Sequence, residues 1–353
     1  MRVLGIETSC DETAAAVVTE TGVVLCDVVR SQIAIHAPFG GIVPEIAARD
    51  HTRTIIAVIR EALTRANLQQ TDLDGIAVTS RPGLSGALLV GLSTAKGLSF
   101  STGVPLVGVD HLVGHLLAVF LQREAQPIAV PAYPYLALLA SGGHTALYRV
   151  DGPKLEKIRE IGATRDDAAG EAFDKVGKLL GLGYPGGPVV DKLAALGEAS
   201  RATDALPKPT AYRQNLEFSF SGLKSSIARY VAATKQPIEG QHLHDLCAAF
   251  QSAVVETLVG KTILAAKSEG LERVVLAGGV AANRGLRAVM AERCRRAKLS
   301  LFVPPFASCT DNAAMIAYAG AQRLVAGERD GMDLAPFTKT ALERVTRKGG
   351  GPR

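Results

Sequence analysis

The sequence contains no tryptophan, and aromatic residues make up only 5% of its 353 residues. Proteins that bind single-stranded nucleic acid without sequence preference stack the bases on aromatic side chains, so no such platform is expected. The five cysteines are scattered and form no CxxC pair. This pattern argues against a disulfide framework and against a cysteine-based zinc site.

Targeting and membrane signals are also missing. The first residues, MRVLGIETSCDE, lack the basic start and the cleavage site of a signal peptide, and no apolar run approaches membrane-spanning length. We therefore expect a cytoplasmic protein that does not bind a membrane. The net charge of +5 is mild, and it permits contact with a polyanion without requiring it.

Two common nucleotide-binding motifs are absent. The run Gly260-Lys261-Thr262 has Val255 where the leading glycine of a P-loop belongs, and no strand is followed by GxGxxG. These absences disfavour a P-loop NTPase and a Rossmann dehydrogenase.

What is present is a repeated pattern of strands and helices. The order strand, strand, strand, helix, strand, helix, strand, helix occurs twice. Strands are expected over 3–8, 14–19, 23–29, 75–80 and 105–109, and again over 135–140, 145–150, 155–159, 273–277 and 300–304. The pattern predicts a duplicated α/β fold of two lobes with a central cleft, and ligands are expected at the carboxyl ends of the strands.

The expected domain boundaries follow from this repeat. An N-terminal lobe should cover 1–130 and a C-terminal lobe 131–330. A segment rich in Gly, Pro, Ser and Lys at about 181–240 is expected to be a loop-rich insertion, and 331–353 a flexible tail.

The stretch PLVGVDHLVGHLL suggests a metal site. Asp110 stands where a helix N-cap would, and His111 and His115 follow on one helical face. Two imidazoles at this spacing can share a divalent metal, although they can equally be solvated residues of an amphipathic helix. A zinc-protease motif is disfavoured because Leu112 occupies the position of the glutamate base. In the second copy, Asp311 occupies the equivalent helix start, so we expect it to face the histidines across the cleft as a third ligand or, alternatively, to cap its helix.

Glycine-bearing turns form a second group of candidates. Backbone N–H groups can approach an anion where no Cβ intrudes, but turns need glycine in any case. The candidates are Arg81-Pro82-Gly83, Ser141-Gly142-Gly143, Gly186-Gly187 before Asp191, and Gly278-Gly279 before Asn283.

Several carboxylates complete the candidate residues. Asp174 is three residues from Glu171, and it could reach a ribose hydroxyl or an amine; the alternative is an acidic helix surface balanced by lysines. Asp11 and Glu12 in the first turn could act as a base or be ordinary turn carboxylates.

The combined motifs closely resemble one family. They are ETSCDETAAAVV, VPEIAARDHTR, VDHLVGHLLA, SGGHT, DDAAGEAFDKVGKLLGLGYPGGP, FSFSGLKSS, AGGVAANRGLR and CTDNAAMIA. This set, which extends from Met1 to about Gly320, resembles the tRNA N6-adenosine threonylcarbamoyltransferases. The resemblance implies the fold of actin, heat-shock ATPases and sugar kinases (the ASKHA fold). It also implies transfer of a threonylcarbamoyl group from threonylcarbamoyl-AMP to N6 of adenosine 37 in tRNAs that read ANN codons.

The resemblance also implies roles for individual residues. His111, His115 and Asp311 would bind one divalent ion, with Fe(II) favoured over Zn(II) or Mg(II). The substrate-binding residues would be Leu139, Ala140, Ser141, Gly142, Gly143, Asp174, Gly187, Asp191 and Asn283. Bacterial members of the family act with a smaller paralogue of the same fold and with a P-loop ATPase.

An acyl-adenylate is already activated, so the chemistry needs positioning, charge stabilisation and a proton acceptor. Glu12 and Asp11 are the candidates for that acceptor. The target base must leave the anticodon-loop stack, and cleft-rim cations would meet tRNA phosphates or remain plain surface charges. These cations are Arg49, Arg53, Arg81, Arg213 and Lys224.

Three other functions are weighed against the tRNA-modifying transferase. A small-molecule kinase or phosphotransferase is suggested by the duplicated lobes and the glycine turns. A metallopeptidase is suggested only by HLVGH, and a nucleotide-switched scaffold is the non-enzymatic alternative.

Overall fold

The computed structural model describes residues 1–123, 128–206, 215–234 and 237–346. Its internal contacts divide the chain into two compact units. Unit 1 comprises Met1–Pro131, Gly152–Ile158 and Pro304–Glu343, and unit 2 comprises Ala132–Asp151, Arg159–Val303 and Arg344–Arg353. The expected C-terminal lobe, 131–330, differs from unit 2 because the chain returns to unit 1 at Pro304.

Unit 1 is built on a sheet of five strands in the order β3-β2-β1-β4-β5. The strands are β1 (Arg2–Glu7), β2 (Glu12–Thr19), β3 (Val24–Ser31), β4 (Gly75–Arg81) and β5 (Leu106–Asp110). The first three pair antiparallel, and β4 and β5 continue the sheet in parallel from β1. The helices are α1 (Ile33–His36), α2 (Pro44–Arg65), α3 (Ser85–Thr102), α4 (His111–Leu117) and α10 (Ala313–Val325), with short 3₁₀ turns η1 (Ala37–Phe39), η2 (Gln70–Asp72), η3 (Ala118–Phe120), η4 (Leu155–Lys157) and η8 (Phe306–Ser308).

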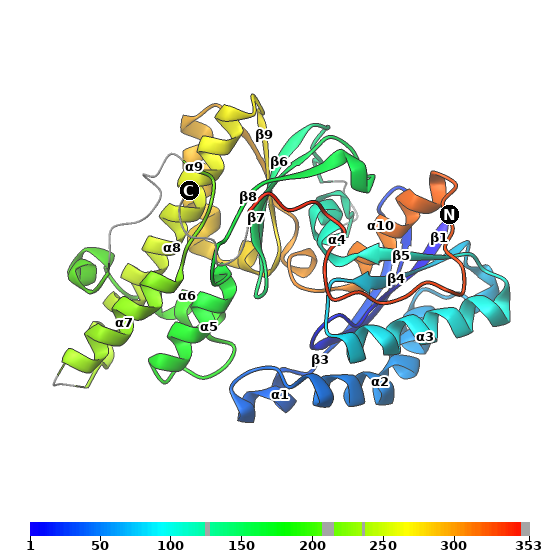
Figure 1. Ribbon diagram of the computed structural model, residues 1–353, viewed down its shortest axis with the longest axis horizontal. Coiled ribbons are helices and arrows are strands. Elements are labelled where there is room, and N and C mark those ends of the chain that lie inside the picture. The colour runs from blue at the N-terminus through cyan, green and yellow to red at the C-terminus, as the bar shows by residue number, and fades with distance from the viewer. Residues whose placement is uncertain (124–127, 207–214, 235–236, 347–353) are drawn as a thin grey trace. The chain divides into compact units, whose positions relative to one another are not determined.

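The two faces of this sheet are covered by different helices. Helices α2 and α3 bury one face, where Leu4 and Ile6 of β1 join the apolar core. Helix α10 packs on the opposite face, against β1, β2, β4 and β5, and it also contacts α4. In Figure 1 the orange α10 lies beside the blue strands of this sheet. Since alternate residues of a strand point to opposite faces, Gly5 lies under α10 while its neighbours face α2 and α3.

Unit 2 repeats the same sheet order, β8-β7-β6-β9-β10. The strands are β6 (Tyr135–Ala140), β7 (Thr145–Val150), β8 (Ile158–Ala163), β9 (Arg273–Ala277) and β10 (Ser300–Phe302). The helices are α5 (Ala169–Leu179), α6 (Gly186–Ala194), α7 (Ser221–Ala233), α8 (Gly240–Ser268) and α9 (Arg284–Arg296), with 3₁₀ segments η5 (Ala199–Ala205) and η7 (Gly279–Ala282). The predicted duplication of an α/β unit is therefore confirmed. The third strand of this copy lies later than 155–159, because η4 occupies Leu155–Lys157.

Helix α8 is long and apolar enough, by length and composition alone, to cross a membrane. This differs from the expectation that no run approaches that length. However, 72% of its most apolar stretch is buried within the protein, as in a core helix that packs against α6 and α9.

Two segments are more ordered than the sequence predicted. The insertion at 181–240 contains helices α6 and α7 rather than mainly loops. The tail expected to be flexible from 331 makes specific hydrogen bonds as far as Thr346, whose backbone N–H donates to Glu160 Oε1 at 3.1 Å in unit 2. Residues 347–353 of that tail lie outside the described residues.

Candidate metal centre and nucleotide pocket

Strand β5 and helix α4 place two imidazoles together in unit 1. The strand ends at Asp110, whose Oδ1 accepts a hydrogen bond from the Leu112 N–H at 2.9 Å and so caps the helix. His111 and His115 follow one helical turn apart, and their ring centroids are separated by 4.7 Å. Both side chains are buried, which makes solvated histidines a poor description of this helix.

Asp311 completes the cluster. Its Oδ1 lies 3.0 Å from His115 Nε2 and 3.4 Å from His111 Nε2. The expectation that Asp311 would approach from the second lobe is wrong, because residues 304–343 belong to unit 1. Its alternative role as a helix cap is filled by Asn312, whose side chain accepts from the Met315 N–H.

The donor set of this metal cluster, His111, His115 and Asp311, fits a divalent transition metal. Ligand atoms about 2.1 Å from one ion lie about 3.0–3.4 Å from each other in tetrahedral or octahedral geometry, which is the range of both histidine–aspartate separations. One ligand atom from each residue lies within 4.8 Å of the other two. Two imidazoles and one carboxylate leave further coordination positions for substrate or water.

Glu7, at the end of β1, contacts His111 at the ring nitrogen that does not face Asp311. Its Oε2 lies 2.8 Å from His111 Nδ1 and accepts a hydrogen bond from Thr79 Oγ1 at 2.7 Å, while its Oε1 accepts from the Ser9 N–H. A carboxylate on one imidazole nitrogen fixes the ring orientation and leaves the other nitrogen for a metal. Sequence reasoning missed Glu7, although its position at the end of a buried strand could have suggested it.

Electrostatics couple these groups tightly. Burial lowers the pKa of His111, but the negative charges of Asp311 and Glu7 outweigh burial and hold that pKa well above 6.5. For Asp311, burial acts to raise the pKa, and the charge of His111 outweighs it, so the pKa lies well below 3.8. Burial lowers the pKa of His115. The negative charges that favour a protonated His111 would equally favour a cation held by these side chains, so metal binding would compete with that proton.

Of the two proposed proton acceptors, Asp11 lies in the turn after β1, and Glu12 is the first residue of β2. Asp11 is buried and Glu12 is half-buried. Burial, and then the negative charges of Asp311 and Asp11, raise the pKa of Glu12 to about 10. The structure therefore places Glu12 in the electrostatic field of the metal cluster. The turn is held from α2 by His51, whose Nε2 lies 3.0 Å from the Cys10 carbonyl oxygen.

Five of the nine predicted substrate residues line one pocket of about 570 Å³ in unit 2, which we call the nucleotide pocket after the ligand that the sequence leads us to expect there. They are Gly142, Asp174, Gly187, Asp191 and Asn283. Leu139 and Ala140 are buried inside β6, and neither they nor Ser141 and Gly143 are among the lining residues.

Hydrogen bonds explain the shape of the nucleotide pocket. Asp174 Oδ1 accepts from the backbone N–H groups of Gly186, at 2.8 Å, and Gly187, at 3.4 Å, and so holds the start of α6. Asn283 caps α9 by accepting from the Leu286 N–H at 2.8 Å. Asp174 and Asn283 therefore build the pocket as well as line it.

Sequence reasoning missed several lining residues of the nucleotide pocket. Phe173 supplies an aromatic side chain, and Lys192 and Arg284 supply positive charge. Arg284 pairs with Asp191 at 3.0 Å. The sequence around Asp191 in α6 did not predict this ion pair, because Arg284 lies in another helix, α9.

The predicted tRNA-contacting cations belong to both units. Arg49 and Arg53 are exposed on α2, and Lys224 is exposed on α7. The guanidinium of Arg81 lies 4.1 Å from the ring centroid of Phe337. Arg213 lies outside the described residues.

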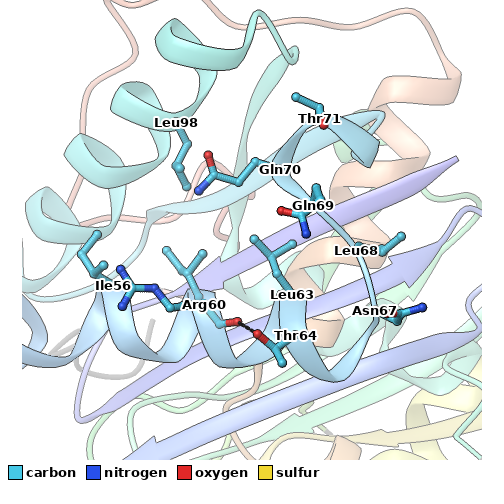
Figure 2. A pocket seen from close by; sticks show the side chains of 11 residues that line it. Ile56, Arg60, Leu63, Thr64, Asn67, Leu68, Gln69, Gln70, Thr71 and Leu98 are labelled. Carbon is cyan, nitrogen blue, oxygen red and sulfur yellow. Dashed lines mark hydrogen bonds between the residues drawn. The ribbon is translucent and has the colours of Figure 1, made fainter.

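A separate pocket of about 640 Å³ lies between α2, η2 and α3 in unit 1. Figure 2 shows the apolar side chains of Leu63 and Leu98 and the polar side chains of Arg60 and Gln70 around it. None of the predicted site residues lines this pocket.

Comparisons with known proteins match these observations. The sequence pattern of the family TsaD, tRNA N6-adenosine threonylcarbamoyltransferase, matches residues 23–318. The chain is 72% identical over its full length to a tRNA N6-adenosine threonylcarbamoyltransferase from Sorangium cellulosum, covering 100% of both chains. It is 52% identical to the protein of the same name from Syntrophotalea carbinolica, covering 98% of each.

A solved structure supports the fold alone. Component A of the (R)-2-hydroxyglutaryl-CoA dehydratase of Acidaminococcus fermentans superposes with a TM-score of 0.51 at 15% identity, covering 91% of this chain and 99% of that one. The duplicated ASKHA-type α/β fold is thereby confirmed.

Proposed function

Since the chain belongs to the family of tRNA N6-adenosine threonylcarbamoyltransferases, it is a tRNA-modifying transferase, and we propose that the metal cluster and the nucleotide pocket carry out its reaction. The donor is threonylcarbamoyl-AMP, and the acceptor is N6 of adenosine 37 in tRNAs that read ANN codons. The N6–carbonyl bond forms, the bond from the carbonyl carbon to the phosphate oxygen breaks, AMP leaves, and N6 loses a proton. Family membership favours this reaction over a small-molecule kinase.

The observation that carries the proposal is the convergence of His111, His115 and Asp311 on one point. When bound there, a divalent ion would supply Lewis acidity toward the carbamoyl oxygen or the leaving phosphate. We favour Fe(II), because two histidines and one carboxylate are the ligands of many non-haem Fe(II) sites; Zn(II) and Mg(II) are the alternatives.

The nucleotide pocket holds the adenylate in this proposal. A Cβ built on Gly142 or Gly279 would have no atom within 4 Å, so a ligand can approach the backbone at both turns. Asp191 and Asn283 would contact the adenosine and its ribose, and Phe173 offers an apolar surface to the base. Asp191→Ala should therefore raise the KM for threonylcarbamoyl-AMP more than it lowers kcat.

Glu12 is the proposed acceptor of the N6 proton, with Asp11 as the second candidate. The adenine amine is a poor nucleophile, so proton removal must accompany attack. Burial beside the carboxylates of Asp311 and Asp11 raises the pKa of Glu12, so Glu12 can act as the base only once a cation at the metal cluster offsets these charges and brings its pKa toward the working pH. Substitution of Glu12 should thus lower kcat while the donor still binds.

tRNA binding would add interactions that depend on salt. The target base must leave the anticodon-loop stack, and cations such as Arg49, Arg53 and Lys224 would meet phosphates. A substitution that removes one cation paired with a phosphate should reduce the slope of log affinity against log salt by about one.

We further propose a cytoplasmic protein that acts with a smaller paralogue of the same fold and with a P-loop ATPase. Exposed apolar side chains on α2 and α3 support a protein partner: Ile56 is 54%, Leu89 53% and Phe100 83% exposed. Phe100→Ser should weaken co-elution with the paralogue. Leu196→Ser, which changes a 59% exposed residue of unit 2, is the matched control and should leave co-elution unchanged.

The deciding experiment is a reconstituted transfer assay with threonylcarbamoyl-AMP labelled in its threonine, ATP, tRNA and the two partners. His111→Ala should abolish incorporation while the circular dichroism spectrum stays that of the wild type. Full incorporation by this variant would exclude the metal role. Phosphorylation of a small substrate by the chain alone would instead support a kinase.

A further inference from the structure

The chain that follows α10 covers an edge of the first sheet. Strand β5 is the last strand in the order β3-β2-β1-β4-β5, so one side of its backbone is unpaired within the sheet. Asp330 occupies that side: its N–H donates to the Leu106 carbonyl at 2.8 Å, and its Oδ2 accepts from the Gly108 N–H at 2.7 Å. The red segment in Figure 1 follows β5 toward α4. An exposed strand edge is thereby protected.

The same segment is fixed again further along. The Phe337 N–H donates to the Ser80 carbonyl at 2.9 Å, at the end of β4. The guanidinium of Arg81 lies over the Phe337 ring. The path of residues 330–337 thus follows the sheet toward the carboxyl ends of its parallel strands, where the metal cluster lies.

Further along, the segment reaches Asp110, the residue that caps the metal-binding helix. Asp110 Oδ2 accepts a hydrogen bond from Thr340 Oγ1 at 2.6 Å and another from the Ala341 N–H at 2.8 Å. Its other oxygen, Oδ1, caps α4 through Leu112. One carboxylate therefore joins the C-terminal segment to the first turn of α4. Hydrogen bonds to an ionised carboxylate are stronger than those between neutral groups, so this junction is a firm one.

We propose that Thr340 and Ala341 position the metal-binding helix by clamping Asp110. His111 is the first residue of α4 and directly follows Asp110. The position of the Asp110 carboxylate therefore determines the position of the His111 backbone. Helix α4 has only seven residues, and a helix this short gains little stability of its own. Its orientation depends on what holds its ends. This inference rests on the proposed metal role of the cluster.

The test measures metal binding rather than turnover. Metal-free protein is titrated with Zn²⁺, and with Fe²⁺ under anaerobic conditions, against a chelator of known affinity. Thr340→Val removes the hydroxyl donor at nearly constant volume. It should weaken metal affinity about tenfold, as the loss of outer-shell support typically does. Thr340→Ser keeps the donor and should bind within twofold of the wild type.

A matched control separates this clamp from general stability. Glu160, in unit 2, accepts hydrogen bonds from the Val345 and Thr346 N–H groups, both at 3.1 Å. Glu160→Gln disturbs the next anchor of the same segment but leaves Asp110 untouched, so metal affinity should not change.

Each outcome decides the question. Wild-type affinity in folded Thr340→Val protein would overturn the clamp and leave the proposed metal role standing. Failure of the wild type to bind either metal would overturn the metal role itself, and the clamp with it. If Thr340→Val does not fold, Thr340→Ala removes the same donor without a second methyl group and takes its place.

Discussion

Glu7 offers the sharpest test of the metal centre, through the substitution Glu7→Gln. The carboxylate is 1% exposed and acts only as an acceptor: Oε1 receives the Ser9 N–H, and Oε2 receives Thr79 Oγ1 and faces His111 Nδ1. A glutamine has the same shape, but one of its two terminal atoms carries N–H groups. In one amide orientation the NH₂ group of the glutamine faces the Ser9 N–H, and in the other it faces Thr79 Oγ1 and His111 Nδ1. One of the two acceptor positions is lost either way.

The size of the effect follows from that conflict. A buried donor left without its acceptor costs about 1–3 kcal/mol of folding free energy, so the variant should be less stable by this amount. The loss of a carboxylate behind a metal-binding histidine typically weakens metal affinity about 10–100-fold. That loss corresponds to about 1.4–2.7 kcal/mol of binding free energy.

Chelator competition with Zn²⁺ on metal-free protein measures the affinity, and urea unfolding measures the stability. Glu160→Gln is the control, because Glu160 is also a buried acceptor, at 2% exposed, but lies in unit 2. It should lose stability without losing metal. If Glu7→Gln bound Zn²⁺ within twofold of the wild type, the supporting role argued for Glu7 would be refuted.

Three further predictions concern single residues. His115→Ala should abolish stoichiometric metal binding, measured by elemental analysis after gel filtration, and transfer activity should fall with it; retained metal would contradict the ligand assignment. Glu12→Gln should lower kcat about 10²–10⁴-fold, the usual contribution of a general base, with little change in KM for the donor; an unchanged kcat would exclude Glu12 as the base. Burial acts to raise the pKa of Asp166, but hydrogen bonds from Ser219, Phe220 and Ser221 outweigh it and lower the pKa below 3.8. The ionised form therefore stabilises the fold above the unfolded-state pKa, and this contribution is lost as pH falls through the lowered value. Asp166→Asn should cost about 1 kcal/mol at pH 7 and progressively less in acid, which urea unfolding at several pH values can check.

The sequence allowed the duplicated fold to be predicted because hydrophobic runs and turn residues act locally. The strands near Val3 and Val78 are buried apolar runs bounded by turns, and such a run can be recognised as a strand from its own residues alone. The Asp110 cap was predictable for the same reason, since a cap contacts only the next turn of its own helix.

What local patterns could not reveal was how distant segments share one unit. The order of the strands did not show that the chain returns to unit 1 after Val303, and this return reassigns Asp311 from an opposing lobe to the same one as His111. The ordered C-terminal segment was missed because its glycines and charges resemble a loose tail, whereas its order comes from Asp110 and Glu160, which lie far away in sequence.

The position of Asp311 depends on two glycines that no motif marks. A Cβ on Gly5 would lie 2.2 Å from the Ala313 carbonyl oxygen, and a Cβ on Gly320 would lie 2.2 Å from the Ala77 Cβ. Both contacts are impossible for a larger residue unless α10 moves away from the sheet. Because Asp311 lies two residues before Ala313, that movement would withdraw its carboxylate from the two imidazoles. The metal cluster therefore depends on how closely α10 packs on β1 and β4. It depends in this way on Gly5 and Gly320, which are not themselves metal ligands.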